Sequence, residues 1–82
     1  MQSKIDTAVD KLKEAEDAYE TLRDKECLDI AEKYNLQHTY YWRLANNLKD
    51  IGVDINDELS EELKELEKRS AEARSELSNY LS

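Results

Sequence analysis

Apolar residues recur along the first quarter of the chain at steps of three and four, which is the spacing of one helix face. The stripe comprises Ile5, Ala8/Val9, Leu12, Ala15, Tyr19 and Leu22. Ser3 with Asp6 three residues later resembles a capping box, which predicts that this helix begins at about residue 3.

The stripe then slips out of phase. Glu26 stands where the next apolar residue is due, and the pattern resumes one residue late at Cys27, Ile30/Ala31 and Tyr34. Such a slip indicates a local change of supercoil or a change of packing partner.

The stretch after Tyr34 allows two interpretations. In one, the helix ends near Asn35, which tolerates a left-handed cap conformation, and Leu36 packs back on the last turn. In the other, a single helix continues to Ile51, because neither Pro nor Gly interrupts residues 1–51. The mediocre helix propensity of residues 34–42 favours the break. It predicts helices over about 3–34 and 38–51.

Gly52 followed by Val53 resembles a Schellman stop, after which Asp54 or Asn56 can cap a new helix. Apolar or small residues then recur at steps of four and three, which predicts a helix over about 56–81; they are Leu59, Leu63, Leu66, Ser70, Ala73, Leu77 and Tyr80. So tight a connection predicts that the helices flanking it are antiparallel neighbours. The fold class expected is all-α, over a single domain of residues 1–82. It would be a long helical hairpin or a three-helix arrangement with coiled-coil-like seams.

A chain of 82 residues is short for a self-sufficient core. Its single cysteine, Cys27, and single histidine, His38, provide neither an intrachain disulfide nor a zinc ligand set. Two helices that share one seam bury few large side chains, so we expect a homo-oligomer, most simply a dimer. The residues expected to mediate this self-association are Ile5, Leu12, Tyr19, Leu59, Leu63, Leu66 and Leu77.

The formal charge of −8 disfavours nonspecific binding to nucleic acid or anionic membranes. Charge is balanced over residues 27–51 and acidic on both sides. No apolar run is long enough for a membrane span, and residues 1–6 lack the apolar core of a signal peptide. Together with a lone thiol, these features predict a soluble, cytoplasmic protein that does not insert into membranes.

Four of the six aromatic residues fall within nine positions: Tyr34, Tyr40, Tyr41 and Trp42. Adjacent residues on a helix point about 100° apart, so one buried stripe cannot hide the last three together. We expect Tyr41, Leu44 and Leu48 to turn inward. The predicted contacts to a protein partner are His38, Tyr40, Trp42 and Arg43, because Trp, Tyr and Arg dominate many interfaces. The alternative is that Trp42 only caps the end of the bundle.

Catalysis has little support. Asp24, Glu26 and Asp29 surround Cys27 and would raise the pKa of its thiol, and His38 is too far along the chain to be its natural neighbour. One glycine cannot build a phosphate-binding loop. We predict no enzyme and no catalytic, cofactor or metal residues.

Two other functions remain as alternatives. Residues 30–44 resemble a helix-turn-helix, in which Ala31, Asn35, Leu36, Tyr41 and Leu44 would pack and Gln37, His38, Tyr40 and Arg43 would face DNA. Few cations stand nearby to contact phosphates, which argues against DNA as a partner. Alternatively, the acidic helices could mimic nucleic acid in the basic cleft of another protein.

The size, acidity and helical character of the chain, above all in residues 1–26 and 40–51, resemble the small accessory proteins of tailed bacteriophages. The lysis-inhibition accessory proteins of T-even phages have a similar length. This resemblance implies binding of the cytoplasmic part of a holin in the host cytoplasm to delay lysis. The resemblance assigns a role to no particular residue of this chain.

Overall fold

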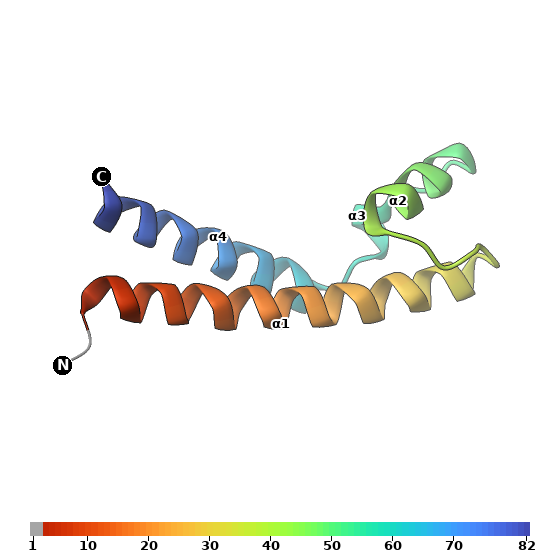
Figure 1. Ribbon diagram of the computed structural model, residues 1–82. Helices are drawn as coiled ribbons and strands as arrows, with labels where there is room; N and C mark the ends of the chain where they lie inside the picture. Colours follow the sequence, from red (N-terminus) through yellow and green to blue (C-terminus); the bar gives the residue numbers. More distant parts are fainter. Residues whose placement is uncertain (1–2) are drawn as a thin grey trace.

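The computed structural model describes residues 3–82, which form four helices and no strand (Figure 1). The helices are α1 (Lys4–Lys33), α2 (Tyr41–Asp50), α3 (Ile55–Glu58) and α4 (Glu61–Leu81). The predicted all-α class is therefore confirmed. The molecule measures 51 × 19 × 19 Å because α1 runs along its whole length. No helix of residues 3–82 combines the length and the hydrophobicity that crossing a bilayer requires.

Both ends of α1 follow local sequence signals. The Ser3 side chain accepts a hydrogen bond from the Asp6 N–H at 3.1 Å, which caps the helix as predicted. Asn35 has a φ of +56°, and the N–H of Leu36 donates to the Ala31 carbonyl at 2.8 Å. This left-handed residue ends the helix, so the break near Asn35 is confirmed and a continuous helix to Ile51 is wrong.

The second helix begins later than the predicted residue 38. Residues 36–40 are non-helical, and Tyr40, in extended conformation, precedes α2 without a side-chain cap. Aromatic and β-branched residues such as Thr39 and Tyr40 favour extended backbone, which delays the start. At the other end, Gly52 adopts a φ of +81° and the N–H of Val53 donates to the Leu48 carbonyl at 2.9 Å. The predicted Schellman stop is confirmed.

The helix predicted over residues 56–81 is interrupted. Asp54 caps the single turn of α3, whose last residue is Glu58, and Leu59 is extended. Ser60 then caps α4 by accepting from the N–H of Leu63 at 3.1 Å. The cause lies in α1: the Glu26 carboxylate accepts from the N–H of Ser60 at 2.8 Å and from its hydroxyl at 2.5 Å. These bonds fix a helix start where the leucine spacing alone indicates continuity.

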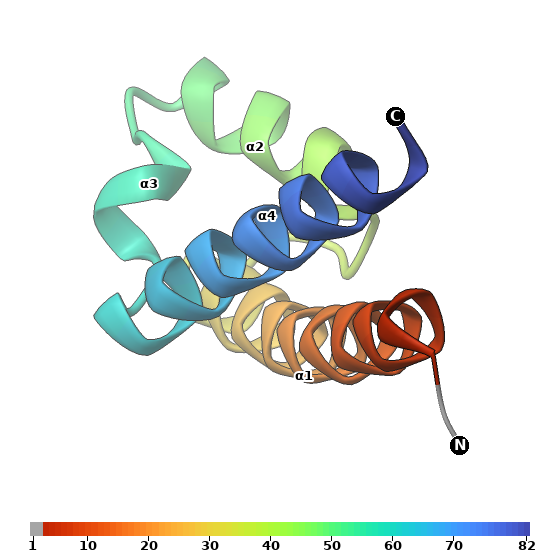
Figure 2. The ribbon, with the colours of Figure 1, turned by 90° about the vertical axis from the view of Figure 1, so that its left-hand side faces the viewer.

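The main helix pair is α1 with α4, which run antiparallel (Figures 1 and 2). Figure 2, viewed from the end that carries the C-terminus, shows α4 stacked on α1 with α2 and α3 farther away. The prediction that α2 and α4 are the antiparallel neighbours is wrong, because the break at Ser60 turns α4 onto the apolar stripe of α1. Two ion pairs at 3.1 Å cross this seam, Lys11–Glu76 and Glu16–Arg74.

The core lies at the other end of the molecule. It contains Cys27, Ile30, Ala31, Leu44, Leu48 and Ile55, contributed by α1, α2 and α3. The slip at Glu26 therefore marks a change of packing partner: before it, the α1 stripe faces α4, and after it, α2 and α3.

Two residues predicted for self-association are used within the chain. Leu63 is 1% exposed and Leu59 packs against the core. Four others lie half-buried along the seam (Leu12, Tyr19, Leu66 and Leu77). Ile5, at the open end, is 40% exposed.

Candidate functional site

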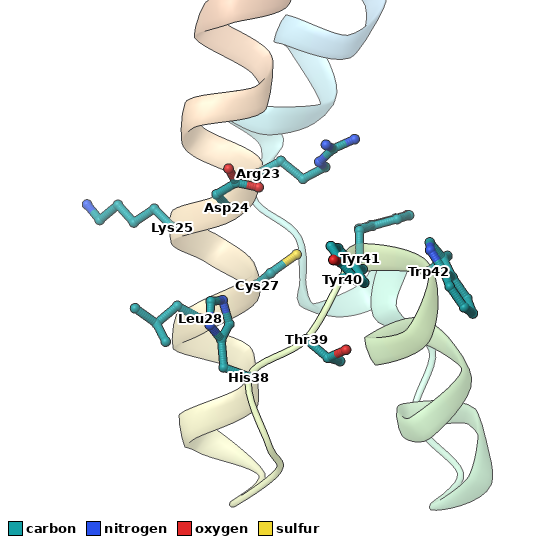
Figure 3. Close-up of a pocket in the computed structure, with 10 residues that line it drawn as sticks. All are labelled: Arg23, Asp24, Lys25, Cys27, Leu28, His38, Thr39, Tyr40, Tyr41 and Trp42. Atoms are coloured by element: carbon teal, nitrogen blue, oxygen red, sulfur yellow. The ribbon is translucent and has the colours of Figure 1, made fainter.

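An open groove of about 950 Å³ lies between α1 and the segment that leads into α2 (Figure 3). One wall comes from the C-terminal third of α1 and the other from residues 38–42. The groove is lined by Arg23, Asp24, Lys25, Cys27, Leu28, His38, Thr39, Tyr40, Tyr41 and Trp42. We refer to these ten residues as the aromatic groove.

The turn at Asn35 creates this groove. Because the chain reverses there, residues 36–40 run back beside α1 and bring Tyr40 opposite Cys27 (Figure 3). The Cys27 sulfur points across the groove towards the tyrosines. The first turn of α2, with Tyr41 and Trp42, completes the second wall.

The adjacent aromatic residues point in different directions. Tyr41 is half-buried and packs against the core that contains Leu44 and Leu48, both 0% exposed. Tyr40 and Trp42 are 72% and 59% exposed. Trp42 is therefore not enclosed by the end of the bundle.

The other two predicted contact residues flank the same surface. His38 lines the groove and is exposed. Arg43 lies just outside it, with its guanidinium 5.6 Å from the centroid of the Trp42 ring. The structure thus brings all four predicted contact residues to one end of the molecule.

Arg23 is the principal residue of the groove that the sequence did not reveal. Its guanidinium carbon lies 5.3 Å from the Tyr19 ring centroid and 5.8 Å from that of Tyr41, so it sits between α1 and α2 as a cation against two rings. The Nε atom is fully buried and has no hydrogen-bond partner within residues 3–82. Half of this arrangement is visible in the sequence, because Tyr19 and Arg23 stand four residues apart on a helix.

Burial is the main cause of the pKa shifts of two titratable groups in the walls of the groove, Cys27 and Tyr41. It raises the pKa of the Cys27 thiol; Arg23 opposes the shift, and Asp24 and Glu26 add to it. Burial is also the main cause of the raised pKa of Tyr41. Both groups therefore stay protonated at neutral pH, and a protonated thiol is a poor nucleophile. No group of three or more His, Cys, Asp or Glu side chains in the described part of the chain could hold a metal ion.

The helix-turn-helix that residues 30–44 resemble in sequence, one of the alternatives, is not formed. Residues 34–40 separate α1 from α2, whereas that motif joins its helices by a turn of about three or four residues. Gln37, His38 and Tyr40 consequently precede α2 and do not lie on a recognition helix.

The chain matches no protein-family model, no curated protein and no solved structure. The chemistry of the groove is therefore inferred from its own residues.

Proposed function

We propose that this protein is a non-enzymatic protein–protein interaction module, and that the aromatic groove is its contact surface. One observation carries the proposal: Tyr40 and Trp42 remain 72% and 59% exposed although Leu44 and Leu48 already close the core. Both rings stand at the edge of a groove instead of being scattered over the surface.

Exposed aromatic rings beside a concave surface favour binding for a physical reason. Each buries a large apolar area with few rotatable bonds, so a partner that covers it gains free energy at a small entropic cost. Leu28 adds an aliphatic side chain, 40% exposed, on the opposite wall. Arg43 is stacked on Trp42, and Arg and Trp are among the residues that most often dominate interfaces.

The resemblance to phage accessory proteins suggests a first partner to test, namely the cytoplasmic segment of a holin. A host or phage protein of another kind would use the same surface.

Affinity capture tests the proposal. The wild type and the Tyr40→Ala/Trp42→Ala variant serve as baits for lysate and for a purified holin segment, with Tyr80→Ala as the matched control. Tyr80 is also an exposed aromatic residue, but it lies near the C-terminus, far from the groove. The proposal expects a protein retained by the wild type and by Tyr80→Ala but lost from the double variant.

Circular dichroism on all three proteins shows whether the double variant is still folded. If it is folded and captures the same proteins as the wild type, the groove is not the contact surface.

A further inference from the structure

The groove carries a local excess of positive charge in an acidic protein. Arg23 lines it, Arg43 stands beside it, and Asp24 is the single carboxylate among its lining residues, whereas the whole chain has a formal charge of −8. Lys25 also borders the groove, but its ammonium points away from residues 38–42 (Figure 3). None of the four ion pairs between side chains of residues 3–82 involves Arg23 or Arg43. Both arginines thus lie outside the ion pairs of the described residues, and Arg23 also borders a second pocket whose lining includes Glu16, Glu20 and Glu67.

The guanidinium of Arg23 is held in place although its N–H donors make no hydrogen bond within the described residues. The two tyrosine rings flank its guanidinium, while its side chain makes no hydrogen bond or ion pair within the described residues. A guanidinium has five N–H donors in a planar fork that matches a carboxylate. Because stacking already fixes the fork, a carboxylate that reaches it loses little entropy in pairing.

The apolar part of the groove lies on the same surface. Leu28 on one wall and Tyr40 and Trp42 on the other are exposed, and the Cys27 sulfur lies between the walls (Figure 3). An occupant that suits the whole surface therefore needs a large apolar side chain and, close to it, a negative charge.

We infer that the aromatic groove binds an acidic segment of a partner protein. A large apolar side chain of that segment packs against Trp42 and Tyr40, and a neighbouring Asp or Glu carboxylate pairs with Arg23. This inference rests on the proposed function. It adds the chemistry of the partner and names Arg23 as the residue that pairs with the partner's carboxylate.

Charge argues against the other polyanion, a nucleic acid. A nucleic acid presents a phosphate at every nucleotide, so binding requires many cations and is opposed by an overall charge of −8. An acidic protein segment offers only one or two carboxylates next to an apolar side chain, which is what two local arginines and three exposed apolar residues can satisfy.

Selection from a displayed random peptide library tests the inference on the full chain. The library is selected on the wild type and counter-selected on Tyr40→Ala/Trp42→Ala. We expect enriched peptides that combine an aromatic or large aliphatic residue with Asp or Glu a few positions away.

The leading peptide is then synthesised with Asp/Glu and with the isosteric Asn/Gln. The wild type should bind the acidic form at least about tenfold more tightly, as expected when a charged hydrogen-bonded pair is lost. This preference should shrink in Arg23→Gln and be partly retained in Arg23→Lys, which keeps the charge but not the fork.

Arg23→Gln also removes a packing contact between two rings, so Arg43→Gln, at an exposed position beside Trp42, provides an independent variant. It should weaken the acidic peptide by up to about fivefold, the size of an exposed ion pair. Lys13→Gln, on α1 but outside the groove, should leave binding unchanged.

The outcomes separate the two proposals. Peptides that need Trp42 but bind equally well with Asn/Gln overturn the inference and leave the proposed function standing. The absence of any peptide that depends on Tyr40 and Trp42 overturns both. Enrichment of sequences that match α4 of this chain makes a second copy the occupant and overturns the inference of a separate partner.

Discussion

The two ends of this molecule bury their apolar residues in different ways. Where α1 meets α2 and α3, elements on several sides enclose large side chains, and Leu44 and Leu48 are completely buried. Along the seam of α1 and α4, the fully buried residues are mostly small, such as Ala8, Ala15 and Ala73. Two helices share only one line of contact, so a leucine beside that line keeps one side in water.

This difference explains where a binding surface can form. The end with the closed core does not need Tyr40 or Trp42 for its stability, so both rings can face solvent on a well-packed support. The seam has no such surplus, because its larger side chains apart from Leu63 are already incompletely covered. We therefore call residues 27–58 the closed end and the α1–α4 seam the open end.

The largest effect should come from deleting a core side chain at the closed end. Leu44→Ala leaves a cavity between α1 and α2 and should lower the free energy of unfolding by about 2–5 kcal/mol. The same change at the open end, Leu77→Ala, should cost about 1 kcal/mol because Leu77 is already half-exposed. Urea unfolding followed by circular dichroism measures both, and equal losses would contradict the distinction between the ends.

The junction of the two ends should be the next most sensitive place. Glu26 accepts two hydrogen bonds from Ser60, so Glu26→Ala should lower the free energy of unfolding by about 1.5–3 kcal/mol. Glu14→Ala, at an exposed position of the same helix, should change it by less than about 0.5 kcal/mol.

A double-mutant cycle with Ser60→Ala checks that this effect comes from the contact itself. A coupling energy above about 0.5 kcal/mol is expected. Additive losses would mean that Glu26 and Ser60 act independently.

The open end should favour self-association. The half-buried seam residues Leu12 and Leu66, with exposed Ile5, Tyr80 and Leu81 near its tip, leave apolar surface that a second copy can cover. We expect a dimer mass in multi-angle light scattering at micromolar concentration. Leu66→Ser should weaken the dimer about tenfold, equivalent to about 1.4 kcal/mol.

Ile51→Ser is the matched control for the dimer. Ile51 is an equally apolar but exposed residue at the turn after α2, away from the seam, so its replacement should not change the mass. A monomeric mass for the wild type at every concentration would show that the seam needs no partner.

The smallest effect concerns an ion pair that joins the elements of the closed end. Lys33 Nζ lies 2.7 Å from Glu58 Oε1, and this hydrogen bond lowers the pKa of the Glu58 carboxyl below its usual value. The unfolded chain therefore binds more protons than the native protein between the two pKa values. The stabilisation is complete above the unfolded-state pKa of about 4.3 and is lost as the pH falls through the lower native value.

Glu58→Gln should remove the contribution of this ion pair to the loss of stability at low pH. Urea unfolding between neutral pH and pH values below about 4 should therefore show a shallower loss of stability in the variant than in the wild type. Glu62→Gln, an exposed residue on the first turn of α4, should retain the response of the wild type. Parallel curves for Glu58→Gln and the wild type would show that the pair does not contribute.

The sequence predicted the features of the fold that depend on a few neighbouring residues. Ser3, Asn35 and Gly52 set helix ends through caps or left-handed conformations, and each acts on its own turn. The division of the aromatic cluster could also be foreseen, because helix geometry prevents adjacent rings from sharing one face.

Features that depend on distant residues could not be read from the pattern. Ser60 starts α4 because Glu26, far away in the sequence, binds it, and the regular leucine spacing conceals that start. Glu61 and Glu62 after Ser60 are a weaker local signal of a helix N-terminus. The pairing of α4 with α1 also depends on residues that are far apart in the sequence. The same holds for the position of Arg23 between two rings, of which only the spacing of Tyr19 and Arg23 was visible in the sequence.

The most direct test of the account uses the fluorescence of Trp42, the only tryptophan of the chain. In the free protein, acrylamide should quench this indole readily, because the closed end does not need it as a core residue. A saturating amount of the selected acidic peptide should protect it, while the Asn/Gln form at the same concentration should not. An indole already shielded in the free protein, or one still fully quenched when the acidic peptide is bound, would contradict the claim that Trp42 is an exposed binding contact.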